Sequence, residues 1–254
     1  MAEPARLYGM RAIVTGASDG IGEAIARTFV KHGAEILACD EPGSGIDATF
    51  RRVQGVTPLA LPADAALPQR LAQASQDVLG GADILVNNFT RHVDGSAVDP
   101  AAVIARLLER IRETTGALVR LLMHSPAGRV INVGFLPSAF GPAGEANVAA
   151  AENAIAKLTA SQAVELGGHG INANYIQPGA IMTPQSRIVF DADKAFRDRC
   201  IRRSAAKRLG EPLDVAKVAL FLASGDAVFV SGTGIAVHGG LVPGDENPGS
   251  RSGT

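Results

Sequence analysis

Three glycines that follow a short apolar run are the residues of this chain whose spacing most clearly predicts a binding chemistry. Residues 12–14 are apolar and lead into Gly16, Gly20 and Gly22, after which apolar residues recur with helical spacing. A strand that turns through glycines into a helix presents backbone N–H groups and the positive end of the helix dipole to a ligand. A side chain at the glycines would block the turn or the ligand. The pattern therefore predicts an anion site, above all for the pyrophosphate of a dinucleotide.

An acidic residue ends the next apolar run. Residues 35–39 are typical of a second strand, and Asp40 follows them about twenty residues after the glycines. A carboxylate at this point accepts hydrogen bonds from an adenosine ribose and repels the 2′-phosphate of NADP. No lysine or arginine stands in the turn to bind that phosphate. We therefore predict NAD as the preferred cofactor, and the plainer alternative is that Asp40 is a solvated residue capping a strand.

Composition excludes several classes of function. The chain has 254 residues, a formal net charge of −1 and no long basic run, which argues against a nucleic-acid partner. Its two cysteines, Cys39 and Cys200, do not make a disulfide framework, and its histidines have no metal spacing. No apolar segment is long enough to cross a bilayer or has the form of a secretory leader. We expect a cytoplasmic protein without a metal site and without a membrane or nucleic-acid partner.

Strand-like and helix-like segments alternate along the chain. Strands are predicted at residues 12–14, 35–39, 58–64, 84–86, 129–133, 171–176 and 234–237, and helices after the glycines and at 67–79, 101–123, 147–166 and 215–223. Mostly apolar strands alternating with helices predict an α/β fold with a mostly parallel sheet covered on both faces. No linker divides the chain, so we predict one domain over residues 1–242 and a disordered tail over 243–254.

Four segments, in this order and spacing, resemble the short-chain dehydrogenase/reductase family over essentially the full length of the chain. They are Thr-Gly-Ala-Ser-Asp-Gly-Ile-Gly at 15–22, Asn-Asn at 87–88, Pro-Gly-Ala-Ile-Met-Thr at 178–183, and Arg-Leu-Gly-Glu-Pro at 208–212 with its continuation at 221–224 and 231–232. The resemblance implies a seven-stranded doubly wound Rossmann fold that binds NAD(P). It also implies an oxidoreductase acting on an alcohol or carbonyl substrate, assembled as a homotetramer or homodimer.

The same resemblance implies a set of cofactor-binding residues. In the family, Asp64 would lie by the adenine, and Ile181 and Thr183 by the nicotinamide carboxamide. The full expected set is Gly16, Ser18, Asp19, Gly20, Ile21, Gly22, Asp40, Asp64, Asn88, Pro178, Gly179, Ile181 and Thr183. Phe89 and Thr90 stand where the family has alanine and glycine, which leave room for the cofactor's ribose. These two residues put ordinary placement of the cofactor in question.

The resemblance also implies that the family's proton-transfer residues are replaced. A tyrosine exchanges a proton with the substrate oxygen, a lysine four residues later lowers its pKa, a serine polarises the same oxygen, and an asparagine holds a water. Alignment places the tyrosine at Val148, the lysine at Glu152, the serine at Phe135 and the asparagine at Glu113. General acid–base catalysis contributes typically about 10²- to 10⁴-fold in rate, and valine has no proton to donate. We expect ordinary carbonyl reduction to be very slow or absent.

Two of these replacements are carboxylates from positions that are close neighbours in the family fold. Glu113 and Glu152 are either partly solvated, paired with an arginine such as Arg112 or Arg129, or a new acid/base pair that shares one proton. The leading expectation is an NAD-dependent oxidoreductase by descent that has lost its proton-transfer residues. The alternatives are a non-catalytic partner or cofactor-binding subunit of an assembly, and an enzyme repurposed for non-redox acid/base chemistry. The intact glycine turn counts against the last.

Overall fold

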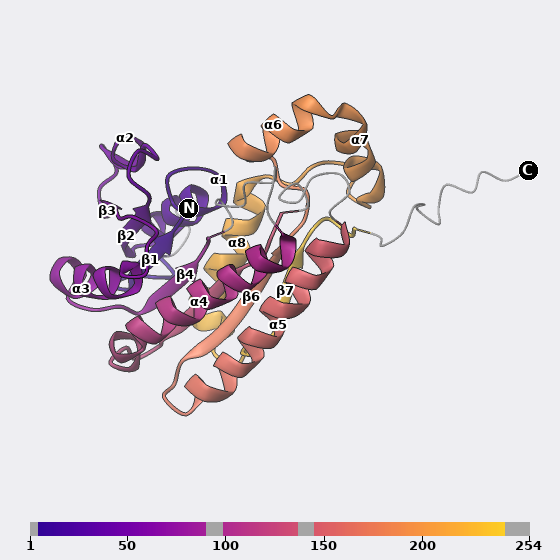
Figure 1. Ribbon diagram of the computed structural model, residues 1–254. Coiled ribbons are helices and arrows are strands. Elements are labelled where there is room, and N and C mark those ends of the chain that lie inside the picture. Colours follow the sequence, from indigo (N-terminus) through magenta and orange to yellow (C-terminus); the bar gives the residue numbers. More distant parts are fainter. Residues whose placement is uncertain (1–4, 90–98, 137–144, 242–254) are drawn as a thin grey trace, which may run out of the picture.

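Seven parallel strands form one sheet in a computed structural model that describes residues 5–89, 99–136 and 145–241 (Figure 1). The strand order is β3-β2-β1-β4-β5-β6-β7, and every neighbouring pair is parallel. The strands are β1 (Arg11–Thr15), β2 (Glu35–Asp40), β3 (Val56–Ala60), β4 (Ile84–Asn87), β5 (Arg129–Val133), β6 (Asn172–Pro178) and β7 (Gly234–Val237). The order reverses between β1 and β4, and in such sheets ligands bind beyond the carboxyl ends of the strands at this reversal.

Helices cover both faces of the sheet (Figure 1). They are α1 (Gly20–Lys31), α2 (Ile46–Phe50), α3 (Leu67–Leu79), α4 (Pro100–Met123), α5 (Glu145–Gly167), α6 (Pro184–Ala192), α7 (Lys194–Arg203) and α8 (Pro212–Ala223), followed by the short 3₁₀ turn η3 (Gly225–Ala227). Helices α1 and α8 bury their apolar residues in one core, whereas α3 and α4 pack against the opposite face. No helix among the residues described has the length and apolar character needed to cross a membrane.

Strand β1 shows why its sequence is uniformly apolar. Ala12 and Val14 pack into the core under α1 and α8, whereas Ile13 packs into the core under α3 and α4. All three side chains are fully buried. Successive side chains of a strand point to opposite faces, so a strand covered on both faces has no polar alternation. Burial on both faces therefore explains why uninterrupted apolar runs predict the strands of this parallel sheet.

The predicted doubly wound α/β fold is confirmed, and one strand was misplaced. The third strand was expected at 58–64 but is observed at Val56–Ala60, where Ile36 pairs with Val56 and Asp40 with Ala60. The strand lies at the edge of the sheet, which tolerates Pro58 because one side of an edge strand needs no N–H donor. The predicted tail at 243–254 lies outside the described residues.

Helix α6 was not predicted, because its signal lies in its cap rather than in an apolar period. The Thr183 hydroxyl accepts a hydrogen bond from the Ser186 N–H at 3.0 Å, and the Ser186 hydroxyl accepts one from the Thr183 N–H at 2.8 Å. This reciprocal arrangement satisfies two N–H groups that a helix start otherwise leaves unpaired. A similar cap begins α7, where the Asp193 carboxylate accepts from the Phe196 N–H at 2.8 Å.

Candidate functional site

The glycine turn after β1 is docked on the turn after β4. Gly16 has a φ of +59°, and a Cβ on it would lie 2.2 Å from the main-chain oxygen of Asn88. The Asn88 side-chain amide donates to the Gly16 carbonyl at 3.0 Å, and the Asn88 N–H donates to the Thr15 hydroxyl at 2.9 Å. Both the backbone conformation and this close approach require glycine. Two loops far apart in sequence are thereby joined at the point where the strand order reverses.

The rest of the turn is packed equally closely. A Cβ on Gly22 would lie 2.1 Å from the Gly16 carbonyl oxygen. A Cβ on Gly20 would lie 3.2 Å from the side chain of Thr183, which begins α6. The start of α6 therefore lies directly over the start of α1.

Asp40, at the carboxyl end of β2, holds the glycine turn from the other side. Its Oδ2 accepts from both the N–H of Ser18 at 3.0 Å and the hydroxyl of Ser18 at 2.6 Å, and its Oδ1 accepts from the Glu41 N–H at 2.8 Å. Asp40 is only 5% exposed. The alternative that Asp40 is a solvated strand cap is therefore wrong, because the carboxylate is buried and positions the turn.

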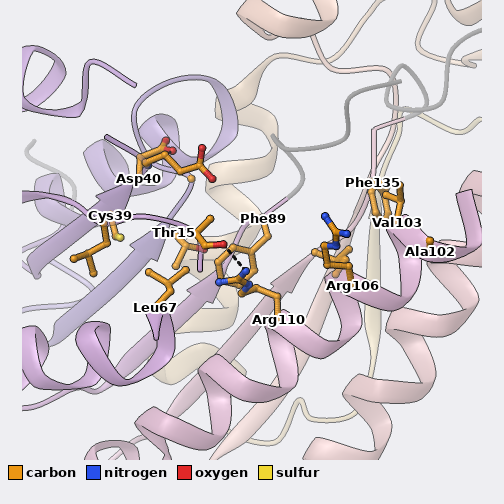
Figure 2. Close-up of a pocket in the computed structure, with 15 residues that line it drawn as sticks. Thr15, Cys39, Asp40, Leu67, Phe89, Ala102, Val103, Arg106, Arg110 and Phe135 are labelled. Carbon is orange, nitrogen blue, oxygen red and sulfur yellow. Dashed lines mark hydrogen bonds between the residues drawn. The ribbon is translucent and has the colours of Figure 1, made fainter. Parts of the chain in front are cut away.

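A cavity of about 320 Å³ opens beside this turn (Figure 2). Figure 2 shows Asp40 on one side of it, Phe135 and Val103 on the other, and Phe89 between them. Thr15 and Gly16 also line it, so it lies beyond the carboxyl ends of β1 and β2 as expected for a ligand site.

Two other lining residues bear on the chemistry of the cavity. Burial, with a contribution from the charge of Asp40, raises the pKa of the Cys39 thiol to about 12, so Cys39 is a thiol rather than a nucleophilic thiolate. Phe89 presents its ring to the cavity, where a smaller residue would leave more room. Thr90 lies outside the described residues.

Two arginines of α4 that are not among the residues expected from the sequence line the same cavity. Arg106 and Arg110 are four residues apart on the helix and so share a face with the lining residues Val103 and Leu107. Arg110 donates to the carbonyl oxygens of residues 63 and 64 at 2.8 and 2.9 Å. The sequence shows these two cationic residues at helical spacing among apolar residues, but only the fold shows that this face of α4 lines a cavity.

Asp64 does not line the cavity, although its backbone is bonded to Arg110, which does. The carbonyl oxygen of Asp64 accepts from Arg110, while its side chain is exposed and pairs with Arg70. The hydrogen bond from Arg70, aided by the Ala66 N–H, lowers the pKa of Asp64. The carboxylate is therefore already paired on the surface.

The segment after β6 approaches from the α1–α8 side of the sheet. Gly179 packs on His238, where a Cβ would lie 2.5 Å from the His238 Cβ, and it follows Pro178, the last residue of β6. Ile181 is buried in the core and pairs with Gly210 through an isolated bridge. Among the expected cofactor residues in this segment, Thr183 packs on Gly20 and Ile181 is buried in the core, and neither lines the described cavity.

The remaining expected residues have structural positions in the turn. Asp19 is the N-cap residue of α1, and Ile21 is buried in the core shared with α8. Of the full expected set, Gly16 and Asp40 line the cavity directly, while Ser18 and Asn88 hold these two in place. Among the residues that the structure describes, no group of three or more His, Cys, Asp or Glu side chains is placed to hold a metal ion.

Phe135 lines the cavity beyond β5, and its N–H is hydrogen-bonded to Glu152. The Glu152 Oε1 accepts from the Phe135 N–H at 3.1 Å, while Oε2 is buried and has no hydrogen-bond partner among the residues that the structure describes. The carboxyl group also lies over Gly134, where a Cβ would be 2.4 Å from Oε1. Phe135 is fully buried in an apolar cluster with Leu107, Ile111, Ala151 and Ile155.

This environment changes the protonation of Glu152. Burial raises the pKa of Glu152 from an ordinary value of 4.5 to about 8, and the hydrogen bond from the Phe135 N–H offsets only part of that effect. Burial and the charge of Glu152 also raise the pKa of Tyr175. Glu152 is therefore a neutral carboxylic acid at pH 7, and Tyr175 remains a phenol.

Glu113 does not belong to this end of the site. It is exposed on α4, and the α4 residues that pack with Phe135 are Leu107 and Ile111. Glu113 lies two residues beyond Ile111, a rotation of about 200° around the helix, so it faces the opposite way. The hypothesis of a Glu113–Glu152 pair that shares a proton is therefore wrong. Val148, on the first turns of α5, is half-buried.

Comparison with known proteins gives matches that span nearly the whole chain. A family model described as enoyl-(acyl carrier protein) reductase matches residues 16–242. The 3-oxoacyl-(acyl-carrier-protein) reductase FabG of Vibrio cholerae is 32% identical over 242 residues, covering 92% of this chain and 98% of that protein. The enzyme of the same name from Thermotoga maritima is 32% identical over 247 residues, covering 93% and 99%.

A solved structure also matches nearly the whole chain, here by similarity of fold. The crystal structure of hydroxysteroid dehydrogenase from Escherichia coli superimposes with a TM-score of 0.79 at 28% identity. The match covers 94% of this chain and 98% of that one. The similarity thus extends from the glycine turn through β7 and is not confined to one motif.

Proposed function

Because this chain belongs to the short-chain dehydrogenase/reductase family, we propose that it binds NAD(H) in the cavity beside the glycine turn and has little or no turnover in the family's usual reaction. By descent it is an oxidoreductase of an alcohol or carbonyl substrate. The observation that carries the proposal is the contrast between the two ends of the site. The end with the glycine turn has the backbone geometry that favours binding of a nucleotide's phosphates, whereas beyond β5 the cavity wall is Phe135, which has no hydroxyl.

The buried carboxylate of Asp40 supports the choice of NAD. Asp40 lines the cavity while Ser18 and Glu41 hold its oxygens in place, so its negative charge cannot swing away from a bound ligand. Ribose hydroxyls can donate to such a carboxylate, whereas a 2′-phosphate would be repelled. The dinucleotide supplies or accepts a hydride when it is bound, and the role of this part of the chain is to bind and orient it.

The contact between Glu152 and Phe135 supports slow turnover. We take these residues to stand at the positions of the family's lysine and serine, with Val148 at the position of its tyrosine. A neutral buried carboxylic acid carries no positive charge to lower the pKa of a neighbouring proton donor, and Phe135 offers no hydroxyl to the substrate oxygen. The same contact favours the second candidate, a cofactor-binding subunit that takes no part in catalysis.

Calorimetric titration of the purified protein with NADH and NADPH tests the binding half of the proposal. We expect NADH to bind and NADPH to bind at least about tenfold more weakly, a difference of roughly 1.4 kcal/mol. Equal affinities would contradict the role of Asp40. Absence of binding by either dinucleotide would contradict the proposed function and would indicate that Phe89 obstructs the cavity.

The catalytic half is tested by following NADH oxidation with a panel of ketones. We expect no sustained turnover by the natural chain. The matched variant Phe135→Ser/Val148→Tyr/Glu152→Lys should gain activity, by up to about 10²- to 10⁴-fold over background, because it returns the proton-transfer groups. Circular dichroism and NADH titration of that variant establish that it is folded and binds cofactor. Sustained turnover by the natural chain would overturn this half.

A further inference from the structure

The α4 wall of the cavity carries two positive charges. Arg110 donates hydrogen bonds to two backbone carbonyls in the loop after β3, which fix its guanidinium group while leaving further N–H donors. Arg106 lies one helical turn away and has no hydrogen-bond or ion-pair partner within the described parts of the chain. One arginine is therefore held in place and the other is available to a ligand.

Two carboxylates line the cavity, Asp40 and Glu41, and they are neighbours at the carboxyl end of β2. Figure 2 shows Arg106 between Arg110 and the Phe135 side of the cavity, with Asp40 at the opposite side. Asp40 is engaged with Ser18, and the carboxylate of Asp64 is paired with Arg70 on the surface. The residues around the two arginines are instead apolar, since Val103, Leu107 and Phe135 share this part of the lining.

This surrounding strengthens any interaction that the arginines make. A guanidinium group binds carboxylate or phosphate oxygens through parallel hydrogen bonds, and such charge-assisted bonds are stronger than bonds between neutral groups. The apolar side chains beside the arginines lower the local dielectric constant on that side, while Arg106 itself is exposed to solvent. An occupant that fits this part of the cavity combines an apolar body with one anionic oxygen group.

We propose that Arg106 and Arg110 form an anion subsite that binds the carboxylate or phosphate monoester of the cavity's ligand. This proposal adds a specificity-determining subsite to the proposed function. It depends on that function only because both place a ligand in the same cavity. The anion has two sources with this chemistry: an acidic substrate with an apolar chain or, if the adenosine ribose lies by the arginines instead of by Asp40, the 2′-phosphate of the cofactor. The subsite sets ligand specificity by charge, independently of whether the family's hydride transfer takes place.

The test is calorimetric titration of the full chain with paired probes. Hexanoate and hexyl phosphate are compared with hexan-1-ol, and NADPH is compared with NADH. The key variant is Arg106→Gln, which removes an exposed charge without disturbing a described contact. The control is Arg112→Gln, which removes an exposed charge from another face of the same helix. Arg110→Gln is a second variant, with thermal melting to detect any loss of its backbone contacts.

We expect the anionic six-carbon probes to bind about tenfold more tightly than hexan-1-ol, which is the scale of a charge-assisted hydrogen bond. Arg106→Gln should remove most of that advantage, and Arg112→Gln should leave it unchanged. If Arg106→Gln instead weakens NADPH binding relative to NADH binding, the subsite is supported, its anion is the cofactor's 2′-phosphate, and the placement of the ribose beside Asp40 is wrong. The proposal is overturned if the anionic six-carbon probes bind no more tightly than hexan-1-ol and NADPH binds as NADH does. It is also overturned if Arg106→Gln changes neither of these two affinity differences.

These outcomes separate the subsite from the proposed function. Binding of the anionic probes with no binding of either dinucleotide would leave the subsite standing and refute the proposed function. If NADH binds and Arg106→Gln changes neither affinity difference, the subsite is refuted and the proposed function stands.

Discussion

At the scale of single residues, Asp40 has a structural role in the glycine turn and a proposed role in binding. Its Oδ2 holds both donors of Ser18 and so shapes the turn in which Gly16 and Gly20 lie. The same carboxylate lines the cavity at the side where we place the ribose. Because its hydrogen-bond donors hold this buried carboxylate in one orientation without a ligand, ligand binding costs little further side-chain entropy at Asp40.

Substitution Asp40→Asn should weaken NADH binding by about tenfold or more, because it replaces a charged acceptor of the ribose hydroxyl with an amide. It should also narrow the difference between NADH and NADPH, since the charge that repels the 2′-phosphate is gone. Calorimetry measures both effects. Asp47→Asn, on the exposed side of α2, is the control and should change neither affinity. Unchanged NADH binding in Asp40→Asn would refute the role of this carboxylate.

At the scale of elements, a buried polar network joins the sheet to the two long helices. The Asn132 Oδ1 on β5 accepts from the Asn87 side chain on β4 at 2.9 Å, and the Asn132 Nδ2 donates to Thr159 and Gln162 on α5 at 2.9 Å each. Thr115 on α4 accepts from Asn87 and Gln162 at 3.2 Å. Such a network fixes the register of helices on strands, which apolar packing alone specifies less sharply.

The variant Asn132→Ala should lower the free energy of unfolding by about 2–4 kcal/mol, because it leaves buried partners on α5 and β4 without their hydrogen bonds. Urea denaturation followed by circular dichroism gives this quantity. Asn153→Ala, at an exposed position of α5, should change stability by less than about 0.5 kcal/mol. A similar small effect of Asn132→Ala would mean that water or local relaxation replaces the network.

At the scale of the whole molecule, two buried carboxyl groups make stability depend on pH in opposite directions. Burial raises the pKa of Asp83, but hydrogen bonds from Arg11 outweigh it, so the net pKa is lowered. The stability that Asp83 contributes is present above its unfolded pKa and is lost as pH falls through the lowered value. Glu152 has a raised pKa, so its contribution is complete below about 4.5 and is lost as pH rises toward about 8.

We therefore predict that the natural chain is less stable at pH 8.5 than at pH 5.5, with Glu152 responsible for a loss of up to roughly 3 kcal/mol. Glu152→Gln keeps an oxygen for the Phe135 N–H and has no charge to bury, so it should flatten this dependence and stabilise the protein at pH 8.5. Urea denaturation at the two pH values measures the effect. Glu113→Gln, which removes an exposed carboxylate, should leave the slope as it is.

Local sequence determined the parts of this protein whose physics is local. The glycine turn, the apolar strands and the acidic end of β2 lie within about thirty residues, and their predicted arrangement agrees with the structure because turn geometry and strand burial depend on neighbouring residues. The third strand was misplaced because its ends are set by pairing with β2, a contact that no local pattern contains.

Only the tertiary structure decided which side chains share a site. Glu113 and Leu107 are both on α4, yet the rotation of that helix against β5 turns Leu107 toward Phe135 and leaves Glu113 exposed. The same rotation brings Arg106 and Arg110 to the cavity wall. Sequence by itself therefore established the fold and the glycine end of the site. The positions of Arg106, Arg110 and Glu152 relative to the cavity depend on how α4 and α5 pack on the sheet, because packing determines which face of each helix is buried.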